Sequence, residues 1–150
     1  PLILDDFRFV YKFFPIVFTK ISNELRAVIL LGENGCRYLQ NGVCTIYDDR
    51  PPSCRIYPLT PYFDKIMIDD NCPSVGDVGE FLADETEISQ KNRSERLVGF
   101  GDKYAKTVEF LDSIQNDLKS IGYYAGYEIF GSKRADNEYL QMHGESLKFL

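Results

Sequence analysis

Apolar positions near the start of the chain predict one short helix followed by β-strands, and those near its end follow a helical pattern. Residues 4–14 carry apolar side chains at spacings of three and four, which is typical of a short helix, and Pro15 would end that helix. β-branched residues then dominate 16–21 and 25–31, with a short polar stretch between them. This pattern predicts a helix followed by a β-hairpin.

The middle of the chain is rich in proline and glycine, which predicts irregular backbone containing two short elements. Residues 51–55 have the composition of one helical turn, because proline suits the first helical position and Pro58 prevents extension. Apolar residues at 62–63 and 66–68 flank a polar pair, so they predict a second small hairpin.

The second half of the chain has helical spacing. One apolar stripe with spacings of three and four consists of Leu97, Phe100, Tyr104, Val108, Leu111, Ile114, Leu118 and Ile121. Glycines near its start leave Asp102 to cap a helix that ends before Gly122. We expect this stripe to face the protein core. Residues 123–131 predict an aromatic connection punctuated by glycine, and 138–150 predict a final helix.

Together these elements predict an α+β fold with a small β-hairpin layer, a loop-rich cysteine region and a mainly helical C-terminal half. The length of 150 residues suits a single domain, with a cysteine-bearing part at 1–79 and a helical part at 80–150.

Charge and hydropathy narrow the classes of function. The net charge of −6 argues against nucleic acid and anionic membranes as partners, because surfaces that bind phosphate are basic. No apolar run approaches the ~20 residues that cross a bilayer, and no secretory signal pattern opens the sequence. We therefore expect a cytoplasmic protein, in which clustered cysteines more often hold metal than form disulfides.

All four cysteines lie in one quarter of the chain with the spacing C-x7-C-x9-C-x17-C: Cys36, Cys44, Cys54 and Cys72. This spacing is neither the C-x2-C pairing of zinc fingers nor a ferredoxin run. Gly35 and Gly42 permit tight turns beside the first two sulfurs. We predict that the four thiolates bind zinc or iron, including iron in an iron–sulfur cluster. Disulfides and unlinked buried thiols are the alternatives.

Two arginines flank the third cysteine. Arg50 and Arg55 can offset the charge of metal-bound thiolates, because guanidinium groups stay charged when partly buried. The alternative for both is a surface ion pair with Asp48 or Asp49. The predicted helical turn places Cys54 where the helix dipole favours the thiolate form.

Two tyrosines and one histidine complete the set of candidate site residues. Tyr47 and Tyr57 can cover the metal and donate hydrogen bonds to its ligands, although we favour plain core packing for both. His143 is the sole histidine, and we expect it to be exposed near a frayed chain end rather than to act as a base or ligand.

The residues around the cysteines carry a resemblance. The pattern Cys-x7-Cys-x-Ile-Tyr-x-x-Arg-Pro-x-x-Cys-Arg-x-Tyr-Pro, followed by a later Cys-Pro, resembles the YkgJ-like cysteine-cluster family, which is described as a zinc- or iron-chelating domain. Relatives of that family include the flagellin lysine N-methylase group. The resemblance covers about residues 1–75, and its specific centre is 44–58. It implies that Cys36, Cys44, Cys54 and Cys72 belong to a metal or iron–sulfur site.

Members of that family usually carry a further C-x-x-C-C cluster just upstream of a segment like 2–7. This sequence begins where such a cluster would end. If the full protein has that cluster, the family pattern implies a second metal or a larger cluster that the four cysteines only partly ligate.

Three functions follow from these patterns. The first is a metal-binding protein that holds zinc or iron through four thiolates. The second is a metal- or iron–sulfur-dependent enzyme related to protein lysine N-methylases, although no glycine-rich nucleotide loop supports it. The third is an interaction module with a structural metal and an unidentified protein partner.

Overall fold

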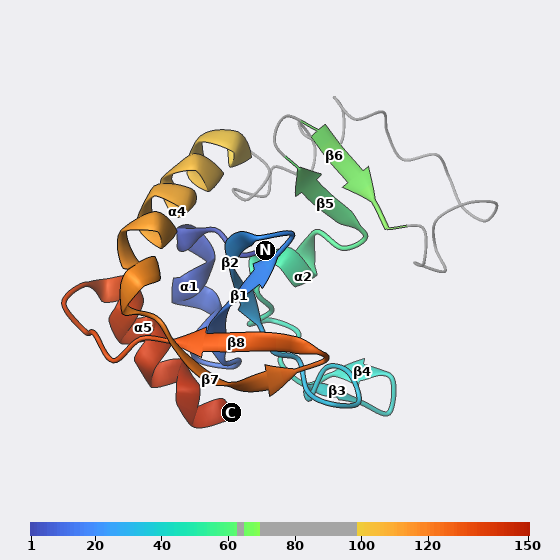
Figure 1. The fold of residues 1–150 in the computed structure, drawn as a ribbon. Coiled ribbons are helices and arrows are strands. Elements are labelled where there is room, and N and C mark those ends of the chain that lie inside the picture. Colours follow the sequence, from blue (N-terminus) through green and yellow to red (C-terminus); the bar gives the residue numbers. More distant parts are fainter. Residues whose placement is uncertain (63–64, 70–98) are drawn as a thin grey trace.

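The computed structural model describes residues 1–62, 65–69 and 99–150, and within them the predicted α+β class is confirmed. A four-stranded antiparallel sheet has the order β2-β1-β8-β7 and therefore joins strands from both ends of the chain. Figure 1 shows the helices α1, α4 and α5 grouped on one side of this sheet. We call residues 1–31 and 99–150, which form the sheet and these helices, the sheet–helix body.

The N-terminal elements are of the predicted types, although the first helix ends at Val10 instead of continuing to residue 14. Helix α1 spans Leu4–Val10, and the buried Asp6 carboxylate accepts a hydrogen bond from the Ile3 N–H (3.0 Å) at its start. Strands β1 (Ile16–Ile21) and β2 (Glu24–Ile29) form the predicted hairpin. Ser22 and Asn23 connect them with φ values of 52° and 65°, which matches the right-handed twist of the strands.

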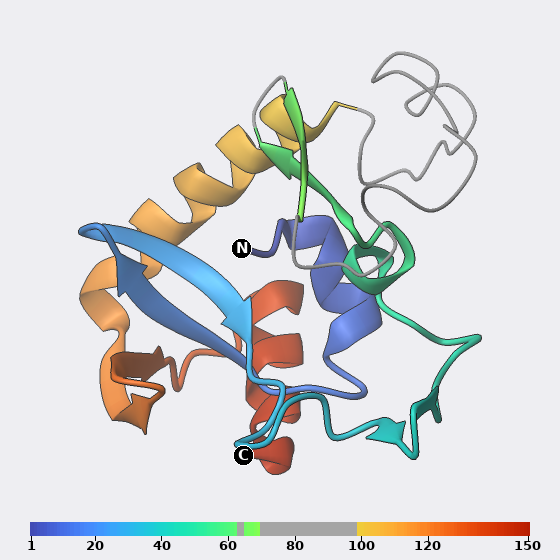
Figure 2. The ribbon, with the colours of Figure 1, turned by 90° about the vertical axis from the view of Figure 1, so that its right-hand side faces the viewer.

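The main hydrophobic core lies between the sheet and the three helices. Its fully or nearly fully buried members come from all these elements: Leu2, Phe7, Val10, Ile16, Phe18, Ala27, Leu111, Ile114 and Leu140. Figure 2 shows α1 and α5 next to one another, to the right of the β1–β2 hairpin. Side chains alternate along β1, so Val17 packs instead into a smaller cluster with Leu30 and Ile129.

The predicted long helix begins earlier and ends sooner in the structure than the sequence indicated. Helix α4 spans Phe100–Ile114 with Gly99 as its N-cap, and one 3-10 turn follows at Gln115–Asp117. The expected cap, Asp102, lies inside the helix, whose buried residues include Tyr104, Leu111 and Ile114. The described part of the stripe therefore faces the core at Phe100, Tyr104, Leu111 and Ile114, and Leu118 packs against the core beyond the helix. Val108 and Ile121 are exposed, and Leu97 lies outside the described residues.

The predicted connection at 123–131 is also wrong, because this stretch belongs to a second hairpin. Strands β7 (Lys119–Tyr124) and β8 (Tyr127–Gly131) meet at a tight turn in which Ala125 and Gly126 have φ values of 48° and 83°. Strand β8 also pairs with β1 in the middle of the sheet. Pairing with β1, which is distant in the sequence, stabilises this stretch as a strand. The helical spacing along the sequence does not reveal this pairing.

The C-terminal helix is confirmed. Helix α5 spans Glu138–Ser146 and continues into a 3-10 turn at Leu147–Phe149. Asn137 caps it, because its side-chain oxygen accepts a hydrogen bond from the Leu140 N–H at 2.9 Å.

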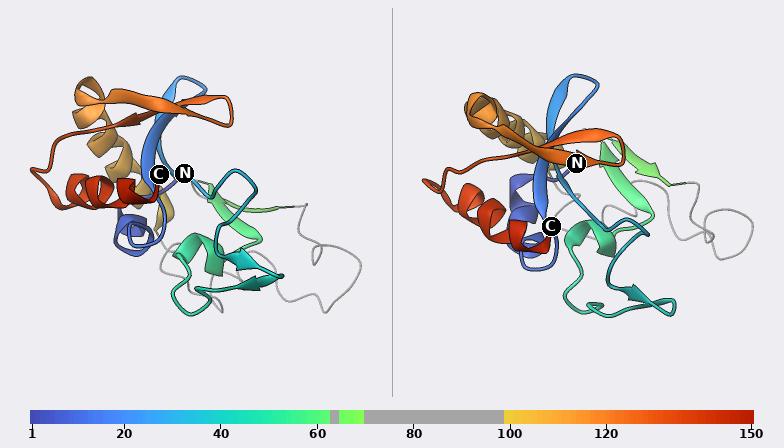
Figure 3. Two further views of the ribbon diagram at one scale, coloured as in Figure 1. Left: turned by 90° about the horizontal axis from the view of Figure 1, so that it is seen from below. Right: turned by 60° about the horizontal axis from the view of Figure 1, so that its bottom comes forward.

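The remaining described elements form an arm outside the sheet, which Figure 3 shows from two sides. Strands β3 (Leu39–Gln40) and β4 (Val43–Cys44) form one hairpin, and helix α2 (Pro52–Arg55) is the predicted helical turn. Strands β5 (Leu59–Tyr62) and β6 (Lys65–Ile68) form the predicted second small hairpin, three residues earlier in its first strand. We call residues 32–62 the cysteine segment.

Candidate metal centre

Three of the four predicted ligands lie on three different parts of the cysteine segment. Cys36 precedes β3, Cys44 is on β4, and Cys54 is in α2. Each is a free, half-buried thiol. The fourth predicted ligand, Cys72, lies outside the described residues.

A tight turn holds the first cysteine. Gly32 has a φ of 131°, and a Cβ there would meet the Gly35 carbonyl oxygen at 2.8 Å, so only glycine fits. The Gly35 N–H donates to Gly32 O (3.4 Å), and the Arg37 N–H donates to Leu31 O (3.1 Å). The chain is therefore fixed on both sides of Cys36.

Tyr38 fastens this turn to the sheet–helix body. Its hydroxyl donates to Phe13 O (2.8 Å), and its ring meets the rings of Phe13 and Phe14 edge-on. The Thr45 N–H donates to Tyr38 O (2.8 Å), which also fixes the end of the hairpin that carries Cys44. Tyr38 thus connects the first two thiols to the protein core.

The turn between β3 and β4 consists of Asn41 and Gly42, with φ values of 51° and 78°. Asparagine followed by glycine is the strongest short-range signal for a two-residue hairpin. The Asn41-Gly42 pair was therefore a usable signal for this hairpin, whereas Gly42 taken alone predicted only a tight turn. The hairpin places Leu39 opposite Cys44.

The two arginines brace the main chain between Cys44 and Cys54. The Arg50 Nε donates to Tyr47 O (2.8 Å), and its guanidinium carbon lies 3.6 Å from the centre of the Tyr47 ring. The Arg55 Nε donates to Arg50 O (2.9 Å) and its Nη2 to Asp48 O (2.8 Å). Within residues 1–62 neither arginine forms an ion pair with Asp48 or Asp49.

The electrostatics differ from the prediction for Cys54. Burial raises the pKa of this thiol, and the charges of Cys36 and Cys44 raise it further. A hydrogen bond with the Ser53 hydroxyl and the positive charge of Arg50 oppose the rise in pKa without cancelling it. The expected stabilisation of the thiolate by the short helix is therefore outweighed, and the protonated thiol is favoured.

The charges of Cys36 and Cys44 both act on the Cys54 thiol, which indicates that these two thiols lie near the third. In the parts of the chain that the structure describes, no three cysteine, histidine or acidic side chains form a group that could hold a metal ion. The donor type fits zinc and iron, whereas the described geometry is that of an open set of ligands.

The tyrosines are not part of the core. Tyr47 is 60% exposed and Tyr57 is 53% exposed, so the core-packing interpretation that we favoured is wrong for both. The Tyr47 ring lies against Arg50, which accounts for its position on the surface. Tyr47 therefore helps to brace the loop between the second and third cysteines.

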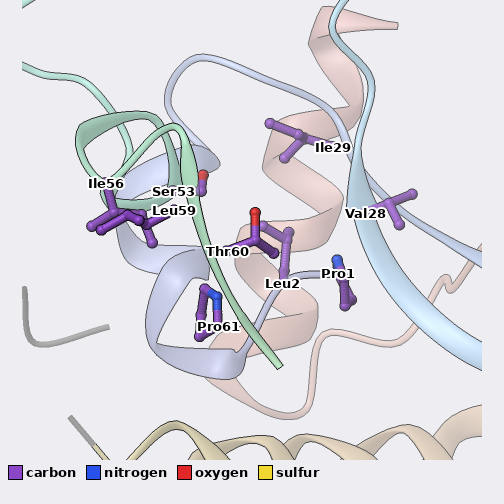
Figure 4. Close-up of a pocket in the computed structure, with 9 residues that line it drawn as sticks. All are labelled: Pro1, Leu2, Val28, Ile29, Ser53, Ile56, Leu59, Thr60 and Pro61. Atoms are coloured by element: carbon purple, nitrogen blue, oxygen red, sulfur yellow. The ribbon is translucent and has the colours of Figure 1, made fainter. Parts of the chain in front are cut away.

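A cavity of about 320 Å³ lies beside α2. Figure 4 shows the apolar side chains that surround it, which come from the N-terminus, β2, α2 and β5. Ser53 lines this cavity and also shares a hydrogen bond with the Cys54 thiol. Ser53 was not among the predicted site residues, although its position directly before Cys54 was a usable signal.

The expectation for His143 is wrong. Its side chain is fully buried, and its Nδ1 lies 2.8 Å from Ile16 O. The Ser132 N–H donates to Nε2 (3.0 Å), which identifies Nδ1 as the protonated nitrogen and donor to Ile16 O. Burial lowers the pKa of the ring. His143 thus joins α5 to β1 and to the end of β8, and it takes no part in the candidate metal centre.

No protein family, curated protein or solved structure that we compared with the chain is detectably similar to it. None of the helices in the described residues is long and apolar enough to span a bilayer.

Proposed function

We propose that this protein binds zinc or iron, including iron in an iron–sulfur cluster, through the thiolates of Cys36, Cys44, Cys54 and Cys72. The observation that carries the proposal is that two half-buried thiols, Cys36 and Cys44, act electrostatically on a third, Cys54, although the three lie on different elements of the segment. Thiolates are the preferred ligands of zinc and of iron–sulfur clusters. The cysteine pattern that resembles the YkgJ-like cysteine-cluster family favours the same chemistry, although no family comparison detects that family in the chain.

A metal would resolve the repulsion among these thiols. Three neighbouring thiolates repel one another, which is why the charges of Cys36 and Cys44 raise the pKa of Cys54. A bound cation replaces the protons and makes the negative charges favourable, so binding releases protons. Arg50, whose charge opposes the rise in pKa at Cys54, would reduce the net negative charge of the loaded site.

The weak packing of the cysteine segment supports the same proposal. Among its described apolar side chains only Pro51, Ile56 and Pro61 are buried, whereas Leu39 and Val43 are more than half exposed. A structural zinc site contributes roughly 10–16 kcal/mol to folding in small zinc-binding peptides. Metal binding can therefore supply the stability that burial does not, and would draw β4 and α2 together as the ligands close around the ion.

The cellular setting is part of the proposal. We propose a cytoplasmic protein, because reducing conditions keep four thiols available for metal. We also propose that it acts without nucleic acid, since its net charge is −6.

The test is elemental analysis combined with an absorption spectrum, on protein purified without oxygen. About one zinc per chain and no visible colour supports a zinc site with four thiolates. Iron with acid-labile sulfide and a brown chromophore supports an iron–sulfur site.

The control is the same protein after complete alkylation of its thiols, which must contain neither metal. Protein that contains no zinc or iron, takes up neither when the metal is added, and shows four freely titratable thiols contradicts the proposal.

A further inference from the structure

Tyr124 occupies a fixed position at the tip of the β7–β8 hairpin. It pairs with Tyr127 across the two-residue turn. Its ring packs against the buried cluster of Val17, Leu30 and Ile129. The β-ladder and this packing together restrict where its hydroxyl can lie.

That hydroxyl contacts both main-chain polar groups of one residue in the cysteine segment. It donates to Gly32 O and accepts from the Gly32 N–H (3.1 Å). The two residues are separated by 92 positions in the sequence, so the contact joins the sheet to the start of the cysteine segment. Figure 1 shows the tip of the hairpin directed towards this part of the chain.

The held residue controls the direction of the chain towards Cys36. Gly32 opens the tight turn, and its carbonyl also accepts the Gly35 N–H (3.4 Å). A Cβ at Gly32 would lie only 2.8 Å from Gly35 O, so glycine alone fits here, and the Gly35-to-Gly32 hydrogen bond ties the two ends of the turn together. A displacement of Gly32 is therefore passed on to Cys36, one residue beyond the turn.

We propose that Tyr124 is a positioning residue for the metal site, holding the Gly32 turn so that the Cys36 thiolate stays in place. This inference rests on the proposed metal binding. The neighbouring Tyr123 provides a matched control, because it is 74% exposed and successive side chains on a strand point to opposite faces. One hydroxyl therefore supports the site, and the adjacent one does not.

The test compares Tyr124→Phe with Tyr123→Phe, each of which loses only a hydroxyl. Both variants are loaded with Zn²⁺, and the rate of zinc transfer to a chromophoric chelator is measured. Tyr124→Phe loses both hydrogen bonds to Gly32, each worth about 1 kcal/mol net, so zinc release should be roughly five- to thirtyfold faster, whereas Tyr123→Phe should release zinc at an unchanged rate. Co²⁺-loaded samples add a spectroscopic readout: the thiolate-to-cobalt absorption should weaken or shift only in Tyr124→Phe.

A second measurement follows the position of Cys36 without metal. The rate at which iodoacetamide alkylates Cys36, located by mass spectrometry, should rise in metal-free Tyr124→Phe and not in Tyr123→Phe. Thermal unfolding of the metal-free variants checks that both retain the fold.

The outcomes separate this inference from the proposed function. If the wild-type protein binds neither Zn²⁺ nor Co²⁺, the proposed function fails and the positioning role fails with it. If the wild-type protein binds metal but the two variants release zinc equally fast, with equal cobalt spectra, only the role of Tyr124 is overturned.

Discussion

The sheet–helix body and the cysteine segment are stabilised by different interactions. In the body, Phe7, Phe18 and Leu140 are completely buried between the sheet and the helices. In the cysteine segment, Pro51, Ile56 and Pro61 are the buried ones among the described apolar side chains, and the others are half-buried or exposed. Burial of apolar surface therefore contributes less to the order of the segment than to that of the body.

Polar contacts hold the segment instead. The Tyr38 hydroxyl of the segment donates to Phe13 O of the body, and the Tyr124 hydroxyl of the body donates to Gly32 O at the start of the segment. Arg55 binds two carbonyl oxygens near the third cysteine. Each such hydrogen bond contributes only about 1 kcal/mol net. The two regions should therefore respond separately to substitution. Packing determines the stability of the body, and polar contacts together with metal determine the stability of the segment.

The largest effect is expected in the body. Phe18→Ala removes a fully buried ring from the central strand β1 and should lower the free energy of unfolding by about 3–5 kcal/mol. Val43→Ala shortens a side chain of the segment that is 65% exposed, and it should change the free energy of unfolding by less than about 0.5 kcal/mol. Urea denaturation followed by circular dichroism measures both. Equal losses in the two variants would contradict the division into two regions.

The next effect should be confined to the segment. Cys54→Ser replaces a proposed thiolate ligand and should weaken Zn²⁺ affinity at least about a hundredfold, because even residues that only support ligands are worth 10–100-fold. Competition with a chelator of known affinity measures the change. Thr60→Ser is the control, since its side chain is exposed and the variant keeps all four thiols.

In metal-free protein Cys54→Ser should unfold at nearly the wild-type urea concentration. A large loss of metal-free stability would show that Cys54 supports the core rather than the metal. Unchanged zinc affinity would remove Cys54 from the site.

A third effect tests the body through pH. The folded state lowers the pKa of His143, chiefly by burial, so the unfolded chain takes up a proton near pH 6.5 before the folded protein does. The contribution of neutral His143 to the free energy of unfolding is therefore fully present above about pH 6.5. Below that pH the free energy of unfolding falls by at most about 1.4 kcal/mol per pH unit. Urea denaturation between about pH 7.5 and 5.5 measures this loss.

Because His143 is the sole histidine, a variant without it gives a clean control. His143→Gln should be less stable at pH 7.5 and should show a flatter dependence on pH. Identical slopes in the two proteins would mean that other groups cause the loss. Zinc release from the cysteine segment gives a separate readout, which His143→Gln should leave unchanged at pH 7.5.

The sequence predicted the local parts of the body and missed the long-range ones. The β1–β2 hairpin was predictable because β-branched runs and a short polar turn are adjacent in the chain. Strand β7 was not, because Leu118 and Ile121 continue the helical spacing of α4. Only the pairing of β7 with β8, and of β8 with β1, decides against the helix, and no local pattern records that pairing.

The same limit applies to the candidate metal centre. The residue types and spacing identified three described thiols and two nearby arginines. Their geometry depends on contacts such as the one between Tyr124 and Gly32, which are far apart in the sequence. The direction of the Cys54 pKa shift was missed for the same reason, since its causes are burial and two other thiols rather than its own helix.

The smallest effect distinguishes two roles for Arg55. Its two hydrogen bonds to Arg50 O and Asp48 O indicate that it braces the chain, whereas the sequence suggested that it offsets thiolate charge. Arg55→Lys keeps the charge but loses the planar fork that reaches both carbonyls. Bracing predicts that Arg55→Lys and Arg55→Ala both release Zn²⁺ about threefold faster than the wild-type protein, within the worth of one or two exposed hydrogen bonds. Charge compensation predicts faster release from Arg55→Ala only. Lys133→Ala removes an exposed positive charge outside the segment and should release zinc at the wild-type rate.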